Sequence, residues 1–372
     1  MHNRALPLIL IVLCVALTAC NAAPTGPGDD ADNGLNPSPP AAGPAAEPPA
    51  ITGEIAGDNA AIQWVEPALE ALMRQELDKP QGDIFPSDLD HVREFRLIGD
   101  THIAININPF SSRLDLHEID SAGMPLKDGT YELDGQQYKR GSISSLADFA
   151  NFRNIKDLRI YKNGLHDLKG LSSLEKLDFL RLRDCAIQNV EDLAELRQID
   201  YLDVGSNHIS DIEPLGNLEQ LSQICLDNCN ISNLDRLSSL KNLQSISVEY
   251  NPVESIDFIS TLAKVTGFSF SGTKVEDISI LAEKTDLLVL RLKNMEVKSV
   301  DLAPLAALKK LRGLSVAQNQ AELLGLQVIG GFKELALLEI VSNDLGISEE
   351  DIAWLREQLP HCQIGPTFDL VL

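Results

Sequence analysis

The segment Ile199-Asp200-Tyr201-Leu202-Asp203-Val204-Gly205-Ser206-Asn207-His208-Ile209 decides the fold, because its pattern recurs along most of the chain. Aliphatic residues stand at its first, fourth, sixth and eleventh positions, and an asparagine stands at its ninth. Alignment on that ninth position gives nine copies, at Asn163, Cys185, Asn207, Cys229, Asn251, Thr273, Met295, Asn319 and Asn343. The spacing is 22 residues for six consecutive steps and 24 for the last two. A short repeat of this kind predicts a solenoid of stacked units.

Each copy combines a short strand with a polar turn. Alternating apolar residues such as Leu202 and Val204 point to the same side of a strand. The asparagine can bond the backbone of the turn, where buried polar groups need partners. No copy buries its own apolar face, so the copies must stack and both ends need caps. Thr273 and Met295 replace the asparagine, and we expect the side-chain hydrogen bonds to be weakest there.

The pattern, of LxxLxLxxNxL type, resembles the leucine-rich repeat family, particularly the 22-residue class of bacterial internalin-like proteins. The tails of the copies, such as Ser210–Leu215 and Glu276–Leu281, are similar to that family as well. A partial copy precedes the nine, with Leu133, Tyr138, Gly141 and Ile143 in register. The resemblance implies the α/β class, as a horseshoe-shaped leucine-rich repeat solenoid with a parallel concave sheet. It also implies an N-terminal helical cap and a C-terminal cap made of a helix and a strand.

The regions outside the repeats complete the predicted domain organisation. Apolar residues on one stripe of Pro67–Leu77 predict a helix, and residues 58–99 are similar to the N-terminal cap of bacterial leucine-rich repeat proteins. Residues 133–347 hold the repeats. Residues 348–372 resemble the C-terminal cap, with Ser348 capping a helix through Glu350 or Asp351. Residues 100–132 fit neither pattern, and we interpret them as an insertion that contains a hairpin.

The first twenty residues predict export. An apolar run, Leu6–Leu17, follows Arg4 and is too short to span a bilayer core of about 30 Å. Leu17-Thr18-Ala19-Cys20 then resembles the lipobox of bacterial lipoproteins, which implies lipidation of Cys20 and removal of residues 1–20. The alternatives are an ordinary secretory signal or a short membrane anchor. Asn21 stands where some lipoproteins carry an inner-membrane retention signal, and this favours the outer membrane of a bacterial cell envelope.

Residues 21–57 predict a disordered tether rich in proline, alanine and glycine. The stretch contains no aromatic residue, so it cannot bury enough apolar surface to offset its ordering entropy. Its run Asp29–Gly34 superficially suggests a calcium loop, but Ala31 and Pro40 stand where oxygen ligands are required. We therefore expect no metal there.

Charge and motifs exclude several functions. The chain has 31 Lys+Arg and 55 Asp+Glu, a net charge of -24, and the exported part carries 30 minus 55, or -25. Such acidity excludes a non-specific nucleic-acid binder. Seven histidines share no pattern, and no catalytic or phosphate-binding motif occurs, so we expect neither an enzyme nor a cofactor. Cys185 and Cys229 lie two repeats apart, about 10 Å by strand spacing, which is too far for a disulfide.

In the leucine-rich repeat family the concave face is the usual binding surface, and its side chains flank the inward-pointing leucines. In this chain those positions form a basic, then an acidic, then a basic band. The candidate ligand-binding residues are Arg159, Tyr161, Arg181, Arg183, Tyr201, Asp203, Asp227, Glu249, Arg291 and Lys293. The first four are the predicted contact patch, because arginine and tyrosine are favoured at interface anchors. A polar sheet face facing solvent is the plainer interpretation of the same pattern.

Two functions of different class follow. The first is a lipid-anchored binding module that recognises a protein, or less readily a polysaccharide, through the concave face. The second is a structural envelope lipoprotein that uses its anchor and solenoid for spacing, without a dedicated ligand.

Overall fold

The computed structural model describes residues 60–100, 102–106, 130–133, 136–317, 321–340 and 347–365. The predicted signal peptide with Cys20, the tether and most of the insertion lie outside these residues. So do the eighth and ninth asparagine positions, Asn319 and Asn343. No helix of the described residues is long and apolar enough to cross a membrane.

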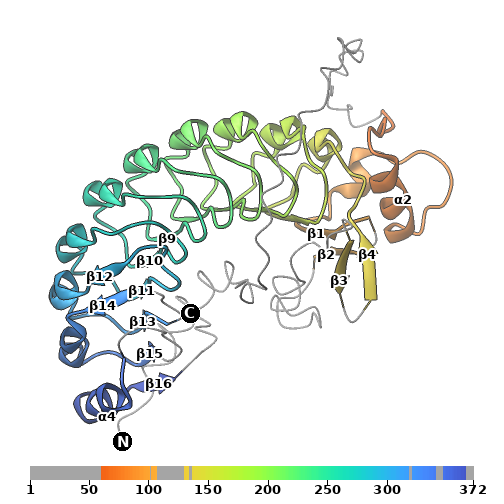
Figure 1. The fold of residues 1–372 in the computed structure, drawn as a ribbon. Coiled ribbons are helices and arrows are strands. Elements are labelled where there is room, and N and C mark those ends of the chain that lie inside the picture. Colours follow the sequence, from red (N-terminus) through yellow and green to blue (C-terminus); the bar gives the residue numbers. More distant parts are fainter. Residues whose placement is uncertain are drawn as a thin grey trace, which may run out of the picture.

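The repeats stack into a curved solenoid with the strands on its inner side, as Figure 1 shows. These strands form one twelve-stranded sheet. Every pairing in this sheet is parallel except that of β1 with β2 at one edge. The parallel strands are β1 (Glu94–Ile98), β5 (Asp157–Tyr161), β6 (Phe179–Arg183), β7 (Tyr201–Asp203), β8 (Gln223–Cys225), β9 (Ser245–Ser247), β10 (Gly267–Ser269), β11 (Val289–Arg291), β13 (Gly313–Ser315), β15 (Leu337–Glu339) and β16 (Gln363–Gly365). The predicted horseshoe with a parallel concave sheet is confirmed.

Short 3-10 helices cover the outer, convex side of the arc (Figure 1). They are η3 (Ala147–Asn151), η4 (Lys169–Ser173), η5 (Glu191–Glu195), η6 (Glu213–Asn217), η7 (Asp235–Ser239), η8 (Asp257–Thr261), η9 (Ser279–Glu283), η10 (Ala303–Ala307) and η11 (Leu326–Gly331). Each is about one and a half turns long, which suits a 3-10 helix used as a connector. A small parallel pair, β12 (Ser299–Asp301) with β14 (Glu322–Leu324), adds to the C-terminal part.

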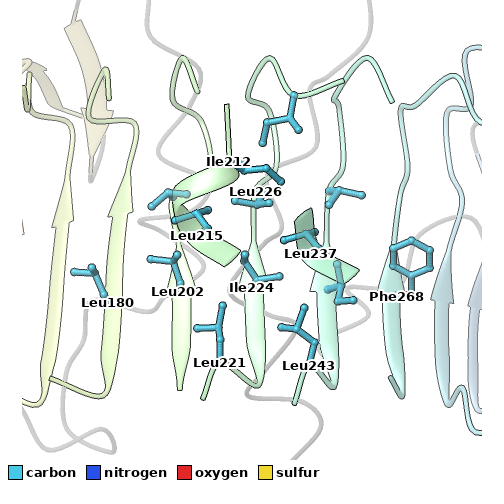
Figure 2. Close-up of a cluster of buried hydrophobic side chains, with 14 of the residues drawn as sticks. Leu180, Leu202, Ile212, Leu215, Leu221, Ile224, Leu226, Leu237, Leu243 and Phe268 are labelled. Carbon is cyan, nitrogen blue, oxygen red and sulfur yellow. The ribbon is translucent and has the colours of Figure 1, made fainter. Parts of the chain in front are cut away.

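The core is a set of aliphatic columns that run through consecutive repeats. Leu180, Leu202 and Ile224 are register partners in β6, β7 and β8, and all three are buried. Figure 2 shows how Leu215 and Leu237, from η6 and η7, close over this column from the convex side. Burying one such side chain contributes about 1.5 to 3 kcal/mol, so stacking supplies the stability that one repeat lacks.

The described asparagine positions form the predicted ladder. Asn207 Nδ2 donates to the carbonyls of Leu182, Val204 and Gly205, and its Oδ1 accepts the N–H groups of Cys185 and Ile187, at 2.7 to 3.2 Å. Thr273, in contrast, makes one bond to a carbonyl, from Oγ1 to Phe270 at 2.7 Å. The prediction of weaker side-chain bonding at Thr273 is confirmed.

The residue before each of the seven described ladder positions is left-handed. Lys162, Asp184, Ser206, Asn228, Tyr250, Gly272 and Asn294 all have φ between 49° and 65°. Asparagine, aspartate and glycine tolerate this conformation best, because other side chains clash with the backbone. Gly272 is needed for a second reason, since a Cβ there would lie 2.4 Å from the Tyr250 ring.

The first repeat differs from the prediction, because its strand does not come from residues 133–139. β3 (Thr130–Leu133) and β4 (Gln136–Lys139) form a separate antiparallel hairpin, and β1 pairs directly with β5. Glu94 opposes Asp157, 63 positions later, whereas Asp157 opposes Phe179 at the usual 22. The first repeat is therefore split by an insertion of 63 minus 22, or 41, residues.

Hydrogen bonds hold the two ends of this insertion together. The two carboxylate oxygens of Asp100 accept the N–H of Ser142 at 2.8 and 2.7 Å. The N–H of Gly141 donates to the backbone carbonyl of Lys162. Gly141 takes the ladder position on return, where a Cβ would lie 2.0 Å from Asn163 Oδ1. The insertion also begins with β2 (His102–Ile105), which pairs antiparallel with β1.

The caps follow the predicted arrangement. Helix α2 (Pro67–Glu76) buries Leu69, Leu72 and Met73 against the first repeat. Helix α4 (Glu349–Gln358) begins with a capping box, in which Ser348 Oγ accepts the N–H of Asp351 and Asp351 accepts the N–H of Ser348. Strand β16 then completes the sheet. Cys185 and Cys229 are free thiols, as predicted, and burial raises the pKa of each to about 12.

Candidate functional site

The concave face is built from the residues that flank the buried aliphatic residue of each strand. Because the strands are in register, equivalent residues form columns across the sheet. The central column runs through Arg96, Arg159, Arg181, Asp203, Cys225, Ser247, Ser269, Arg291, Ser315 and Glu339. Three arginines in successive strands therefore stand together at the N-terminal end.

Arg159 is held in place by its own strand and by the next one. Its Nε and Nη2 donate to the two carboxylate oxygens of Asp157 at 2.8 and 2.6 Å. Its guanidinium lies over the Phe179 ring, 4.3 Å from the centroid. Phe179 in turn stacks on Tyr201 at 3.9 Å with an interplanar angle of 6°. The side chain keeps 16% exposure, so it reaches the surface of the concave face.

Arg181 and Arg183 share one carboxylate. Arg181 Nε lies 2.9 Å from Asp203 Oδ2, and Arg183 Nη1 lies 3.4 Å from Asp203 Oδ1. Arg181 also donates to the hydroxyls of Tyr161 at 3.2 Å and Tyr201 at 2.7 Å. Asp203 is fully buried and both arginines are nearly so. A buried guanidinium needs such partners, because an uncompensated charge in the interior is costly.

The acidic band is buried too. Asp227 Oδ1 accepts the hydroxyl of Ser247 at 2.6 Å and the N–H of Glu249 at 2.8 Å. Glu249 accepts the hydroxyl of Ser269. Burial and the neighbouring Glu249 carboxylate hold the pKa of Asp227 well above its ordinary value, although Arg183 acts in the opposite direction.

Lys293, in the second basic band, also has an acidic partner within the sheet. Lys293 Nζ lies 3.6 Å from Glu339 Oε2, and the same carboxylate accepts the hydroxyl of Ser315. Arg291 is buried, with 2% exposure. The bands predicted from the sequence are real, but much of their charge is balanced by neighbours within the sheet.

The structure brings the predicted contact patch together, with Arg159 the most accessible of its members. Arg159 and Arg181 are register neighbours, as are Tyr161 and Arg183. Tyr161, Arg181 and Arg183 are nearly fully buried, which differs from the solvated face that the pattern suggested. Their contact with a partner stays a prediction. Tyr201, Asp203, Asp227, Glu249, Arg291 and Lys293 follow along the same face.

Sequence reasoning missed Arg96 and Phe179. Val92, Phe95 and Leu97 match the first, fourth and sixth positions of the repeat, so Arg96 was visible as a concave residue once the split repeat was allowed for. Phe179 precedes the first strand leucine of its repeat, at the position that Tyr201 occupies in the next. In the described part of the chain, no group of three or more His, Cys, Asp or Glu residues could hold a metal ion.

No protein-family model matches the chain, and no curated protein matches it in sequence. Among solved structures it is similar to an internalin from Listeria monocytogenes, with 19% identity and a TM-score of 0.56 over 84% of this chain and 85% of that one. It is also similar to a leucine-rich repeat protein from Leptospira interrogans, with 22% identity and a TM-score of 0.52 over 60% of this chain and 58% of that one. At these identities the likeness shows the fold, and the fold is a leucine-rich repeat solenoid.

Proposed function

We propose that this protein is a non-enzymatic, lipid-anchored binding module that recognises a protein partner through its concave face. The observation that carries the proposal is the ordered cluster of Arg159, Phe179, Tyr201 and Arg181 on that face. Arginine and tyrosine dominate the energetics of many protein interfaces. Here ion pairs and ring stacking already fix these side chains, so little rotamer entropy is lost when a partner binds.

Charge reversal of an accessible residue tests this proposal without dismantling the sheet. Arg159→Glu changes a partly exposed side chain, whereas reversal of Arg181 or Arg183 would bury an acid beside Asp203. Arg197→Glu is the matched control, because Arg197 is exposed in the segment between η5 and β7. The measurement is crosslinking and pull-down from envelope extracts with each variant.

We expect Arg159→Glu to lose a partner that the original chain and Arg197→Glu both retain. An identical set of partners for all three proteins would remove the concave patch from the proposal. It would instead favour a structural envelope protein whose solenoid acts as a spacer.

The anchor is a separate part of the proposal and depends on the sequence of residues 1–20. Cys20 lies outside the described residues, so its chemistry needs a direct experiment. We expect a clickable palmitate analogue to label the expressed chain and the Cys20→Ala variant to lose that label. Label retained by Cys20→Ala would contradict lipidation at this residue. We place the anchored protein in the bacterial envelope, at the outer membrane, and protease treatment of intact cells would report which side it faces.

A further inference from the structure

Arg96, Arg159 and Arg181 form a row across successive strands, and Arg96 alone of the three has no acidic partner among the residues that the structure describes. Its Nε and Nη1 are buried and make no hydrogen bond within the described part of the chain. Asp157, the acid of the next strand, is engaged by Arg159 through both oxygens. The opposite register neighbour of Arg96 is Ala104 in β2, which offers no charge.

The surroundings make this guanidinium costly in the protein alone. Arg159 and Arg181 follow it in the same column, so three positive groups stand in successive strands. Burial, followed by the charge of Arg159, lowers the pKa of Arg96. Leaving a buried charged donor without an acceptor costs more than the interaction itself would contribute. An anion bound at the exposed part of the Arg96 guanidinium would offset part of that cost and reduce the repulsion between the three arginines.

The aromatic residues beside this row help to choose the kind of anion. Sugar rings bind by stacking on an open aromatic face, but neither face of Phe179 is open. Arg159 from β5 lies over one side of the ring and Tyr201 from β7 stacks on the other. The Tyr201 hydroxyl is already bonded to Arg181. What remains is the guanidinium of Arg96, whose side chain is partly exposed, and a guanidinium matches a carboxylate group.

We propose that Arg96, supported by Arg159, is a carboxylate-binding subsite that receives an aspartate or glutamate side chain from an acidic segment of a partner protein. This proposal rests on the proposed function and specifies the chemistry that the concave face recognises. It places the subsite at the N-terminal end of the sheet, in the repeat that the insertion splits.

The probe for this subsite is a synthetic peptide of alternating glutamate and glycine, with its glutamine–glycine counterpart as the neutral control. Binding to the full chain is measured by calorimetry at about 0.15 M salt, where a Debye length of about 8 Å screens the distant acidic surface. We expect the glutamate peptide to bind and the glutamine peptide to bind at least tenfold more weakly. We expect Arg96→Gln to lower affinity for the glutamate peptide by about tenfold or more, because the variant loses the charge-assisted hydrogen bonds to the carboxylate. Arg197→Gln, with the same change of charge, should bind as the original chain does.

Thermal unfolding distinguishes a binding residue from a structural one. If Arg96 is costly in the free protein, Arg96→Gln should fold and should raise Tm by roughly 2 to 4 °C. A lower Tm would mean that Arg96 supports the fold, and it would overturn the proposal. Equal binding of the two peptides, or binding that Arg96→Gln does not change, would overturn it as well.

Polygalacturonate provides the remaining arm of the experiment. If it binds in an Arg96-dependent way while the glutamate peptide does not, the subsite belongs to an acidic glycan and the peptide proposal is wrong. Failure of the carboxylate subsite can be distinguished from failure of the proposed function. If Arg159→Glu loses a protein partner that Arg96→Gln keeps, the concave face still binds protein and only the carboxylate subsite is rejected.

Discussion

Glu66 and Asp148 hold each other's segments through reciprocal hydrogen bonds between carboxylates and the backbone. The carboxylate of Asp148, in η3, accepts the N–H groups of Val65 and Glu66, each at 2.9 Å. Glu66 Oε1 accepts the N–H groups of Ser144 and Ser145 at 2.8 and 2.6 Å. No side chain at the start of α2 caps that helix. This pair, 82 positions apart, therefore joins the N-terminal cap to the first repeat.

Removal of Asp148 should loosen that joint. Asp148→Ala leaves two N–H groups without acceptors at a buried site, and we expect a loss of about 1 to 3 kcal/mol in the free energy of unfolding. Asp192→Ala is a matched control, because Asp192 is also the second residue of its 3-10 helix but accepts only one long bond, 3.3 Å from Leu168 N. The control should change stability by less than about 0.5 kcal/mol. Equal losses in urea unfolding would show that the Glu66–Asp148 pair has no special role.

Asp203 should be among the most sensitive positions on the concave face. Asp203→Asn keeps the shape of the side chain but removes the charge shared by Arg181 and Arg183. Breaking a buried ion pair costs about 3 to 5 kcal/mol, and we expect a loss of that order. Asp286→Asn breaks an exposed pair with Lys310, 2.6 Å long, and should cost less than about 1 kcal/mol. A loss at Asp203 as small as the loss at Asp286 would show that the two arginines are compensated elsewhere.

The repeats were predictable because the same pattern of apolar and hydrogen-bonding residues recurs nine times along the sequence. Residues equivalent to Leu202, Val204 and Asn207 recur in each copy at positions that are either buried or hydrogen-bonded. The sheet, the asparagine ladder and the residues of the concave face could therefore be predicted from the sequence alone. The split first repeat was not predictable in this way, since Phe95 and Leu97 lie 41 residues out of register with it. The burial of Arg181 and Asp203 also escaped prediction. Ion pairing between neighbouring strands depends on side-chain conformation, and the identity of the residues along the concave column does not specify that conformation.

The ladder should divide the solenoid into parts of unequal stability. Asn207→Ala removes five buried hydrogen bonds, and we expect it to cost about 2 to 4 kcal/mol. Thr273→Val removes one hydroxyl donor while keeping the volume, and should cost about 1 kcal/mol. Because each repeat contacts only its neighbours, weak repeats open locally, and amide hydrogen exchange should be faster around Thr273 and Met295 than around Asn207. Uniform protection along the arc would contradict this division.

Asp227 should make stability depend on pH. An acid whose pKa is raised in the folded state keeps its proton to a higher pH than it does in the unfolded chain. The free energy of unfolding therefore falls as pH rises above the ordinary value of 3.8, until the pH exceeds the raised pKa. Asp227→Asn removes this loss and can keep the bonds from Ser247 and Glu249 N to Oδ1. We expect the variant to gain stability relative to the original chain between pH 4 and pH 7, by about 1 kcal/mol or more, since each pKa unit corresponds to about 1.4 kcal/mol.

Asp235→Asn, an exposed change on η7, should leave the pH profile of urea unfolding as it was. Parallel profiles for Asp227→Asn and the original chain would show that the Asp227 carboxyl titrates alike in the folded and unfolded states.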